Sequence, residues 1–214
     1  DMAEKTIRVW DPLVRLFHWS LVLAFIVAWL TGEEEGALHA NAGYVILGLV
    51  LFRLVWGFVG TRHARFSDFL FSPRQTFAYL RSMAGGRPDH YTGHNPAGGW
   101  MIFMLLASLL IAVYTGLEAY GAEGHGPLAN GGPAIELVAT ARADDDDDAD
   151  EHEHEDGENP EEEFWEELHE FFSNFTLLLV IVHVAGVIVA SRLHGENLVK
   201  AMLTGRKTVP DADK

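Results

Sequence analysis

Apolar residues gather into four long runs that polar segments separate. The runs cover residues 13–31, 38–59, 99–120 and 164–191. Their central parts, 21–30, 101–117 and 177–190, contain no Asp, Glu, Lys or Arg. A helix of about 20 apolar residues crosses the roughly 30 Å hydrocarbon core of a bilayer. The pattern therefore predicts an all-α fold, a single-domain bundle of four transmembrane helices.

The ends of the runs support this interpretation. Tryptophans, whose rings favour the headgroup region of a bilayer, lie close to run ends: Trp10, Trp19, Trp56, Trp100 and Trp165. The first run follows basic residues, as a cleaved signal peptide would. It is longer than the apolar part of such peptides, however, and ends in Thr31-Gly32-Glu33 without a small-x-small cleavage site. We expect it to stay in the mature protein.

Charge is segregated along the chain, although the net charge of −16 alone would suggest a soluble acidic protein. Fourteen of the 15 Lys and Arg residues lie before or early in the first run, from the end of the second run to the third, or after the fourth; the exception is Arg142. Basic residues favour the cytoplasmic side of a membrane. We therefore expect a membrane protein with both termini in the cytoplasm.

Two connecting segments have contrasting compositions. Residues 121–163 form an acidic loop on the extracytoplasmic side, which includes five consecutive aspartates at 144–148, and we expect it to be disordered. His152 and His154 in this loop could bind a divalent cation, but histidines in a charged run are usually only exposed. On the other side, Ser72-Pro73 is typical of a helix start and predicts a short helix on the membrane surface.

Four of the 11 histidines lie at membrane depth: His18, His39, His169 and His183. One such histidine alone is as often a hydrogen-bonded core residue as a functional one, but four together favour a function. His169 and His183 are 14 residues apart, almost four helical turns, so both rings lie on one helix face about 21 Å apart. They cannot bind the same metal ion.

Antiparallel helices supply partners for both rings. His18 lies about two turns into the first run and His183 about two turns before the end of the fourth, so they have similar depths. His39 begins the second run on the outer side, where His169 lies. Two imidazoles can close the coordination of a haem iron, and the chain has no cysteine for covalent attachment. The pattern predicts two haem b groups stacked across the membrane, with these histidines as axial ligands.

Further residues suit such cofactors. Gly43, Ser173 and Gly186 follow ligand candidates by about one turn and would leave space for a macrocycle, although small residues also let membrane helices pack closely. Arg15, Arg53, Arg62 and His63 are candidates for contacts to the propionates of the cytoplasmic-side haem. Positive-inside anchoring explains the same cations equally well.

These residues resemble the bacterial cytochrome b561 family and the b-type cytochrome subunits of nickel-iron hydrogenases. The matching elements are Arg15-Leu16-Phe17-His18-Trp19, Leu38-His39 with Gly43-Tyr44, the segment from Gly60 to Phe66, and the histidine pair of the fourth run. The resemblance implies a four-helix di-haem protein in which the third span provides no ligand. It also implies a location in the bacterial inner membrane and electron exchange between membrane quinone and a partner protein. The acidic loop lies outside the resemblance.

Three functions remain as hypotheses. The first is electron transfer between the quinone pool and a redox partner on the outer side, such as a basic c-type cytochrome that docks on the acidic loop; a spacer role for the loop is nearly as plausible. The second is a membrane-anchor and electron-relay subunit of an extrinsic oxidoreductase such as a hydrogenase. The third, histidine-based zinc or copper transport, is disfavoured because the deep parts of the spans lack acidic residues. No feature indicates nucleic-acid binding, and any turnover would be redox chemistry of the haem.

Overall fold

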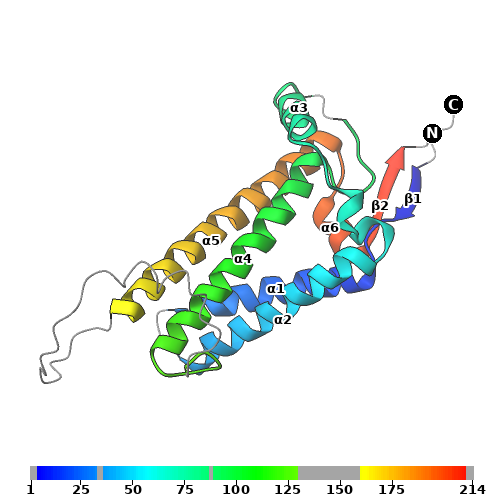
Figure 1. Ribbon diagram of the computed structural model, residues 1–214. Coiled ribbons are helices and arrows are strands. Elements are labelled where there is room, and N and C mark those ends of the chain that lie inside the picture. Colours follow the sequence, from blue (N-terminus) through cyan, green and yellow to red (C-terminus); the bar gives the residue numbers. More distant parts are fainter. Residues whose placement is uncertain (1–3, 33–35, 87–88, 130–159, 211–214) are drawn as a thin grey trace, which may run out of the picture.

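Four long helices dominate the computed structural model, which describes residues 4–32, 36–86, 89–129 and 160–210. They are α1 (Pro12–Leu30), α2 (Ala37–Val59), α4 (Pro96–Ala122) and α5 (Pro160–His194). α1 runs beside α2 and α4 beside α5, and the two helix pairs are inclined to each other (Figure 1). All four are long and apolar enough to cross a membrane. The predicted four-helix transmembrane bundle is confirmed.

Local sequence signals set where these helices begin. Asp11 and Asn95 are the N-caps of α1 and α4, and each side chain accepts a hydrogen bond from the backbone N–H three residues later. Each cap is followed by a proline. Proline fits the first helical turn because backbone N–H groups there have no acceptor within the helix, so the N–H that proline lacks is not needed. Gly36 and Gly60 flank α2. Of the acidic loop at 121–163, residues 130–159 lie outside the described residues.

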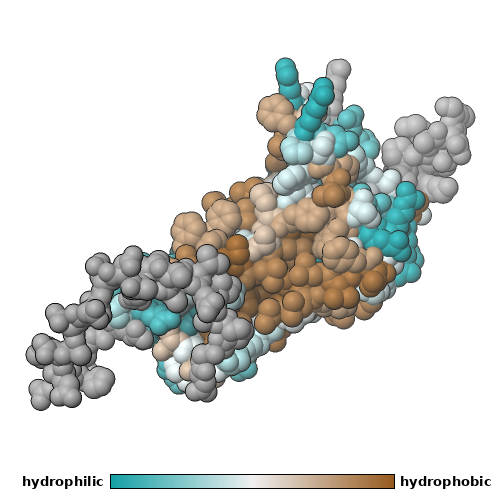
Figure 2. Space-filling view, in the orientation of Figure 1, coloured by the Kyte–Doolittle hydropathy of each residue, from teal (hydrophilic) through white to brown (hydrophobic). Residues whose placement is uncertain are grey.

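The bundle is apolar both inside and outside. Its interior contains Phe17, Ala24, Ile46, Val50, Leu106 and Leu109, contributed by α1, α2 and α4. Large apolar side chains also cover the outer surface; Leu30 and Phe58 are each 74% exposed. Figure 2 shows this hydrophobic surface over the middle of the molecule, with hydrophilic residues towards the ends. Such a surface is stable only in lipid, and the protein is a multi-pass membrane protein.

Short elements cover the end of the bundle that carries both termini. The 3₁₀ turns η2 (Arg62–Ala64) and η3 (Phe66–Asp68) lead to α3 (Pro73–Ala84), which packs against α4. Ser72 and Gln75 form a reciprocal capping box at the start of α3, so the short helix predicted from Ser72-Pro73 is confirmed.

A two-stranded ribbon at the same end was not expected in an all-α protein. β1 (Glu4–Arg8) pairs antiparallel with β2 (Arg206–Pro210), which follows the short helix α6 (Leu198–Thr204). Behind the ribbon, Val9 and Trp10 pack against Ala201. Trp10 is only 7% exposed, so its ring packs inside the protein. The ribbon places both termini on one side of the bundle (Figure 1).

Asp11 joins the start of α1 to the end of α2. Its Oδ1 accepts a hydrogen bond from the Val14 N–H (2.9 Å), and its Oδ2 accepts from the Thr61 hydroxyl (2.5 Å) and the Trp56 indole N–H (3.2 Å). Burial raises the pKa of Asp11, but these hydrogen bonds together outweigh it and hold the pKa below the ordinary value of 3.8. The ionised carboxylate is therefore the form that stabilises the fold.

We predict that Asp11→Ala lowers the free energy of unfolding by about 1–2 kcal/mol, because a helix cap and two tertiary hydrogen bonds are lost. Because the pKa of Asp11 is lower in the folded state, its stabilisation is present above about pH 4 and is lost as pH falls further. Thermal unfolding in detergent as a function of pH measures both effects. Asp11→Asn should reduce the loss of stability below pH 4, and an unchanged dependence of stability on pH would contradict this role of Asp11.

Candidate functional site

Four histidines form two pairs at opposite ends of the bundle. The ring centroids of His18 and His183 lie 6.5 Å apart, and those of His39 and His169 lie 5.9 Å apart. We call the first the inner pair, because it lies towards the end that carries the termini, and the second the outer pair. The structure thus brings together the partners predicted from the sequence.

Helix α5 contributes one ring to each pair. His169 and His183 are separated by 14 residues of uninterrupted helix, so their side chains leave the same face about 21 Å apart. Their partners come from helices of opposite direction: His18 is the seventh residue of α1 and His39 the third residue of α2. Each ring pair therefore bridges α5 and the α1–α2 pair.

Backbone carbonyls hold both rings of the outer pair. His39 Nδ1 lies 2.9 Å from the carbonyl oxygen of Ala28, and His169 Nδ1 lies 2.8 Å from that of Ala112. A carbonyl oxygen only accepts, so each Nδ1–H donates, and the Nε2 of the neutral ring keeps its lone pair. This is the arrangement that orients histidines for metal binding through Nε2.

Gly116 makes room for His169. A Cβ atom at this position in α4 would lie 2.8 Å from Cε1 and 2.9 Å from Nδ1 of the His169 ring. Only glycine lets the ring come so close to α4 while it donates to Ala112. The third span, which carries no histidine, thus orients one.

In the inner pair, His18 lacks such a backbone acceptor within the part of the chain that the structure describes. His18 Nδ1 is buried and has no hydrogen-bond partner among the described residues. The ring packs edge-on against Trp19, with ring centroids 5.1 Å apart. The described residues around His18 thus pack against its ring but provide no acceptor for Nδ1.

There is open space beside both pairs, on the helix faces that carry the histidines. Gly43 follows His39 by four residues and Gly186 follows His183 by three, and a Cβ added at either would meet no atom within 4 Å. Ser173, one turn after His169, is half-buried. These are the positions predicted to leave room for a macrocycle, and they stay predictions for that role.

The spacing of each pair suits one metal ion between the rings. Imidazole nitrogens bind first-row metals at about 2.0–2.1 Å, so two rings on opposite sides of one ion have centroids roughly 6 Å apart. Among the described residues, no group of three or more His, Asp or Glu side chains could hold a metal ion by itself. Two ligands per ion fit a haem iron, whose macrocycle supplies the other four.

Comparison with known proteins agrees with this geometry. A model of the family described as prokaryotic cytochrome b561 matches residues 9–205. The chain belongs to this family. It is a membrane-bound b-type cytochrome, an electron-transfer protein whose cofactor is haem b, and the histidine pairs fit that cofactor.

Similar proteins bear the name of one kind of subunit. A probable Ni/Fe-hydrogenase B-type cytochrome subunit of Cupriavidus necator is 26% identical over 97% of this chain and 89% of its own length. A protein of the same name in Azotobacter vinelandii is 28% identical over 58% of this chain and 62% of its own length. Another in Rhodobacter capsulatus is 22% identical over 97% of this chain and 84% of its own length. No solved structure gives a significant match to the chain.

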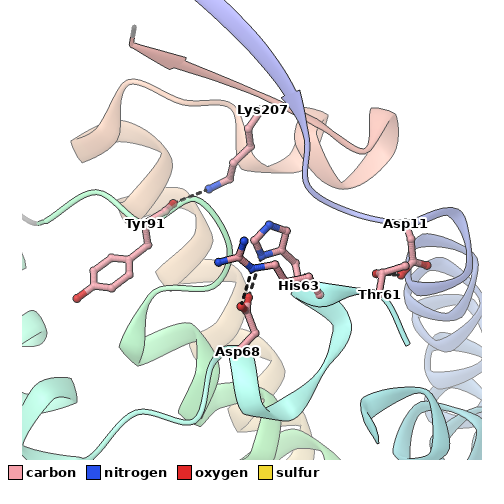
Figure 3. A network of polar contacts seen from close by, with 7 residues as sticks. Asp11, Thr61, His63, Asp68, Tyr91 and Lys207 are labelled. Atoms are coloured by element: carbon pink, nitrogen blue, oxygen red, sulfur yellow. Dashed lines mark hydrogen bonds and ion pairs between the residues drawn. The ribbon is translucent and has the colours of Figure 1, made fainter. Parts of the chain in front are cut away.

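The cations predicted near the inner pair of this cytochrome have different surroundings. Arg62 has an 86% exposed side chain and lies 3.7 Å from Asp68, and His63 Nδ1 lies 2.8 Å from the same carboxylate. In Figure 3, His63 and Asp68 point towards each other at one end of the bundle. Arg15 donates to the Leu203 carbonyl. Arg53 alone is buried, at 3% exposure, with its guanidinium 4.9 Å from the centre of the Phe66 ring.

Sequence reasoning missed a fifth enclosed histidine, His94. It lies in the turn before α4, and its ring packs between Trp10 and Phe69 with both centroid distances 4.5 Å. Its Nδ1 is buried without a partner in the described part of the chain. The sequence places His94 outside the apolar runs, so only the fold of the connecting segment reveals its burial.

We predict that Gly116→Ala displaces the His169 ring, because the added methyl group would overlap it. The outer-pair haem signal should fall or shift while the inner-pair signal persists, as measured by low-temperature absorption of the reduced cytochrome. Gly48→Ala is a matched control, because an added Cβ there meets no atom within 4 Å and Gly48 faces away from His39. Equal spectra for the Gly116 variant and the control would contradict this role.

Proposed function

We propose that this cytochrome transfers electrons across the membrane through two haem b groups, as the membrane subunit of an enzyme of the Ni/Fe-hydrogenase type. His18 and His183 bind the inner haem iron, and His39 and His169 the outer one. The single observation that carries the proposal is the presence of two imidazole pairs, 6.5 and 5.9 Å apart, at opposite ends of a transmembrane bundle.

The protein's own residues fix the coordination. Bound haem b supplies an iron that changes between the ferric and ferrous states. Two histidines per iron leave no open coordination position, which favours electron transfer over oxygen binding. The carbonyls of Ala28 and Ala112 hold the outer rings in the tautomer that leaves Nε2 free. Gly43, Ser173 and Gly186 leave space for the macrocycles.

The names of the relatives favour the anchor-and-relay function over free exchange with a diffusing partner. In this proposal an extrinsic hydrogenase on the outer side exchanges electrons with the outer haem, and quinone of the inner membrane exchanges them with the cytochrome. Both termini lie in the cytoplasm. The acidic loop, of which residues 130–159 lie outside the described residues, helps to dock a partner with a basic surface, because opposite charges steer encounters.

We expect His183→Ala to lose the inner haem and to keep the outer haem, because the two pairs share no ligand. Redox titration of the reduced absorption band measures this as the loss of one of two components. His90→Ala is the matched control, since His90 lies at the same end and is exposed, next to Glu196. Retention of both components in the His183 variant would refute the assigned pairing.

The partner can be identified by purification in mild detergent. We expect a stoichiometric large subunit to co-purify at low ionic strength, whereas a basic c-type cytochrome would exchange electrons without staying bound. Replacing residues 144–156 by a neutral Gly-Ser segment of equal length should weaken this complex and reduce its dependence on salt. Identical binding by the neutral variant at low ionic strength would leave the loop only a spacer role.

A further inference from the structure

Buried polar atoms without partners gather at one end of the cytochrome. In the described part of the chain these atoms are Arg15 Nε, His18 Nδ1, Arg53 Nη1 and His94 Nδ1. All belong to the end with the inner pair, whereas both outer-pair Nδ1 atoms have carbonyl acceptors. Buried nitrogens of native proteins are almost always hydrogen-bonded, so this concentration calls for an acceptor from outside the chain.

Arg53 is the strongest of these groups. It is the seventh residue from the end of α2, so it matches the depth of His18, the seventh residue of antiparallel α1. Its side chain is almost fully buried, and no described carboxylate lies within ion-pair distance of it. The rings of Phe66 and Phe69, 4.9 and 5.9 Å from its Cζ, hold the guanidinium in place without neutralising it.

His94 comes to the same place from a different element. Its ring lies 4.5 Å from that of Phe69, so Phe69 contacts both His94 and Arg53. Phe69 is completely buried and therefore fixes both groups. Burial first, and then the positive charges of Arg53 and Lys207, lower the pKa of His94 to about 3. The ring is thus a neutral hydrogen-bond donor in a region of positive potential.

We infer that Arg53 and His94 form a carboxylate-binding site that holds a propionate of the inner haem. The inference rests on the proposed function, because the propionate is the carboxylate that the inner haem would bring to this depth. An arginine gives the strongest hydrogen bonds to such a group, and a neutral imidazole N–H adds a directional one. Arg62 and His63 are left out because each contacts Asp68. Arg15 is left out because its guanidinium already donates from Nη2 to the Leu203 carbonyl, although its Nε has no partner among the described residues.

A free inorganic anion such as chloride or phosphate could accept the same hydrogen bonds from Arg53 and His94. The two sources can be distinguished by haem binding. A propionate site strengthens the binding only of a haem with free carboxylates, whereas an anion site affects the binding of any haem and depends on the added salt. Haem b and its dimethyl ester separate them, because esterification removes the negative charge and leaves the iron and the macrocycle unchanged.

The experiment uses the full-length His169→Ala protein, which is expected to carry the inner haem alone. Apoprotein in detergent is titrated with haem b and with the dimethyl ester, and the dissociation constants are compared. We expect Arg53→Gln to weaken the binding of haem b at least about 10-fold, since a charge-assisted hydrogen bond is lost. The same variant should bind the ester as the parent protein does, within about a factor of three.

Two further variants make the result specific. His94→Phe keeps an aromatic ring between Trp10 and Phe69 and removes the nitrogen, and it should weaken haem b binding about fivefold while sparing the ester. Arg62→Gln removes an exposed arginine at the same end and should change neither value. Equal weakening for both haems, unchanged binding of haem b, or an effect that follows added chloride or phosphate would each overturn the inference. If the parent protein binds no haem at all, the proposed function fails instead.

Discussion

The helical repeat of α5 is the constraint on which the site depends. Because 14 residues are close to four full turns, His169 and His183 project from one face, and a single straight helix supplies one ring near each membrane surface. Antiparallel neighbours then have to present a histidine at each of two depths. α1 presents His18 near its start. α2 presents His39 near its own start, which lies at the opposite end of the bundle because α1 and α2 are antiparallel. The spacing of roughly 6 Å within each pair follows from the packing of the helices.

The two pairs differ in how their rings are supported. Main-chain carbonyls hold the outer rings, and Gly116 lets α4 come close enough to provide one of these acceptors. Around the inner pair, several side-chain nitrogens have no partner within the described ranges, and buried Arg53 packs against the rings of Phe66 and Phe69. The protein thus preorganises the rings of the outer pair, whereas in our proposal a haem propionate completes the hydrogen bonding around the inner pair. Because local charge and hydrogen bonding tune haem potentials, we expect the two haems of the proposed function to differ in potential.

Sequence patterns predicted the parts of the structure that depend on local periodicity. Uncharged apolar runs predicted the four spans, and the positions of His18, His39, His169 and His183 predicted which rings meet. Ser72 and Pro73 predicted α3, because capping is a property of neighbouring residues. The spans and the pairing of the rings need only helix geometry and the thickness of a bilayer.

The features that were missed depend on contacts between distant segments. β1 and β2 lie almost 200 residues apart, and neither strand has a pattern that identifies its partner. Likewise, the contacts of Arg62 and His63 with Asp68 were not predicted, and their role as propionate contacts stays a prediction. His94 was overlooked for the same reason, since its burial depends on Trp10 and Phe69 from two other segments.

The central claim is that paired imidazoles hold one haem b near each membrane surface. Pyridine haemochrome analysis of the purified protein, expressed with ample haem supply and normalised to polypeptide by amino-acid analysis, tests it most directly. The account predicts two haem b per chain. A value of one, or a colourless protein that is correctly folded in the membrane, would contradict it.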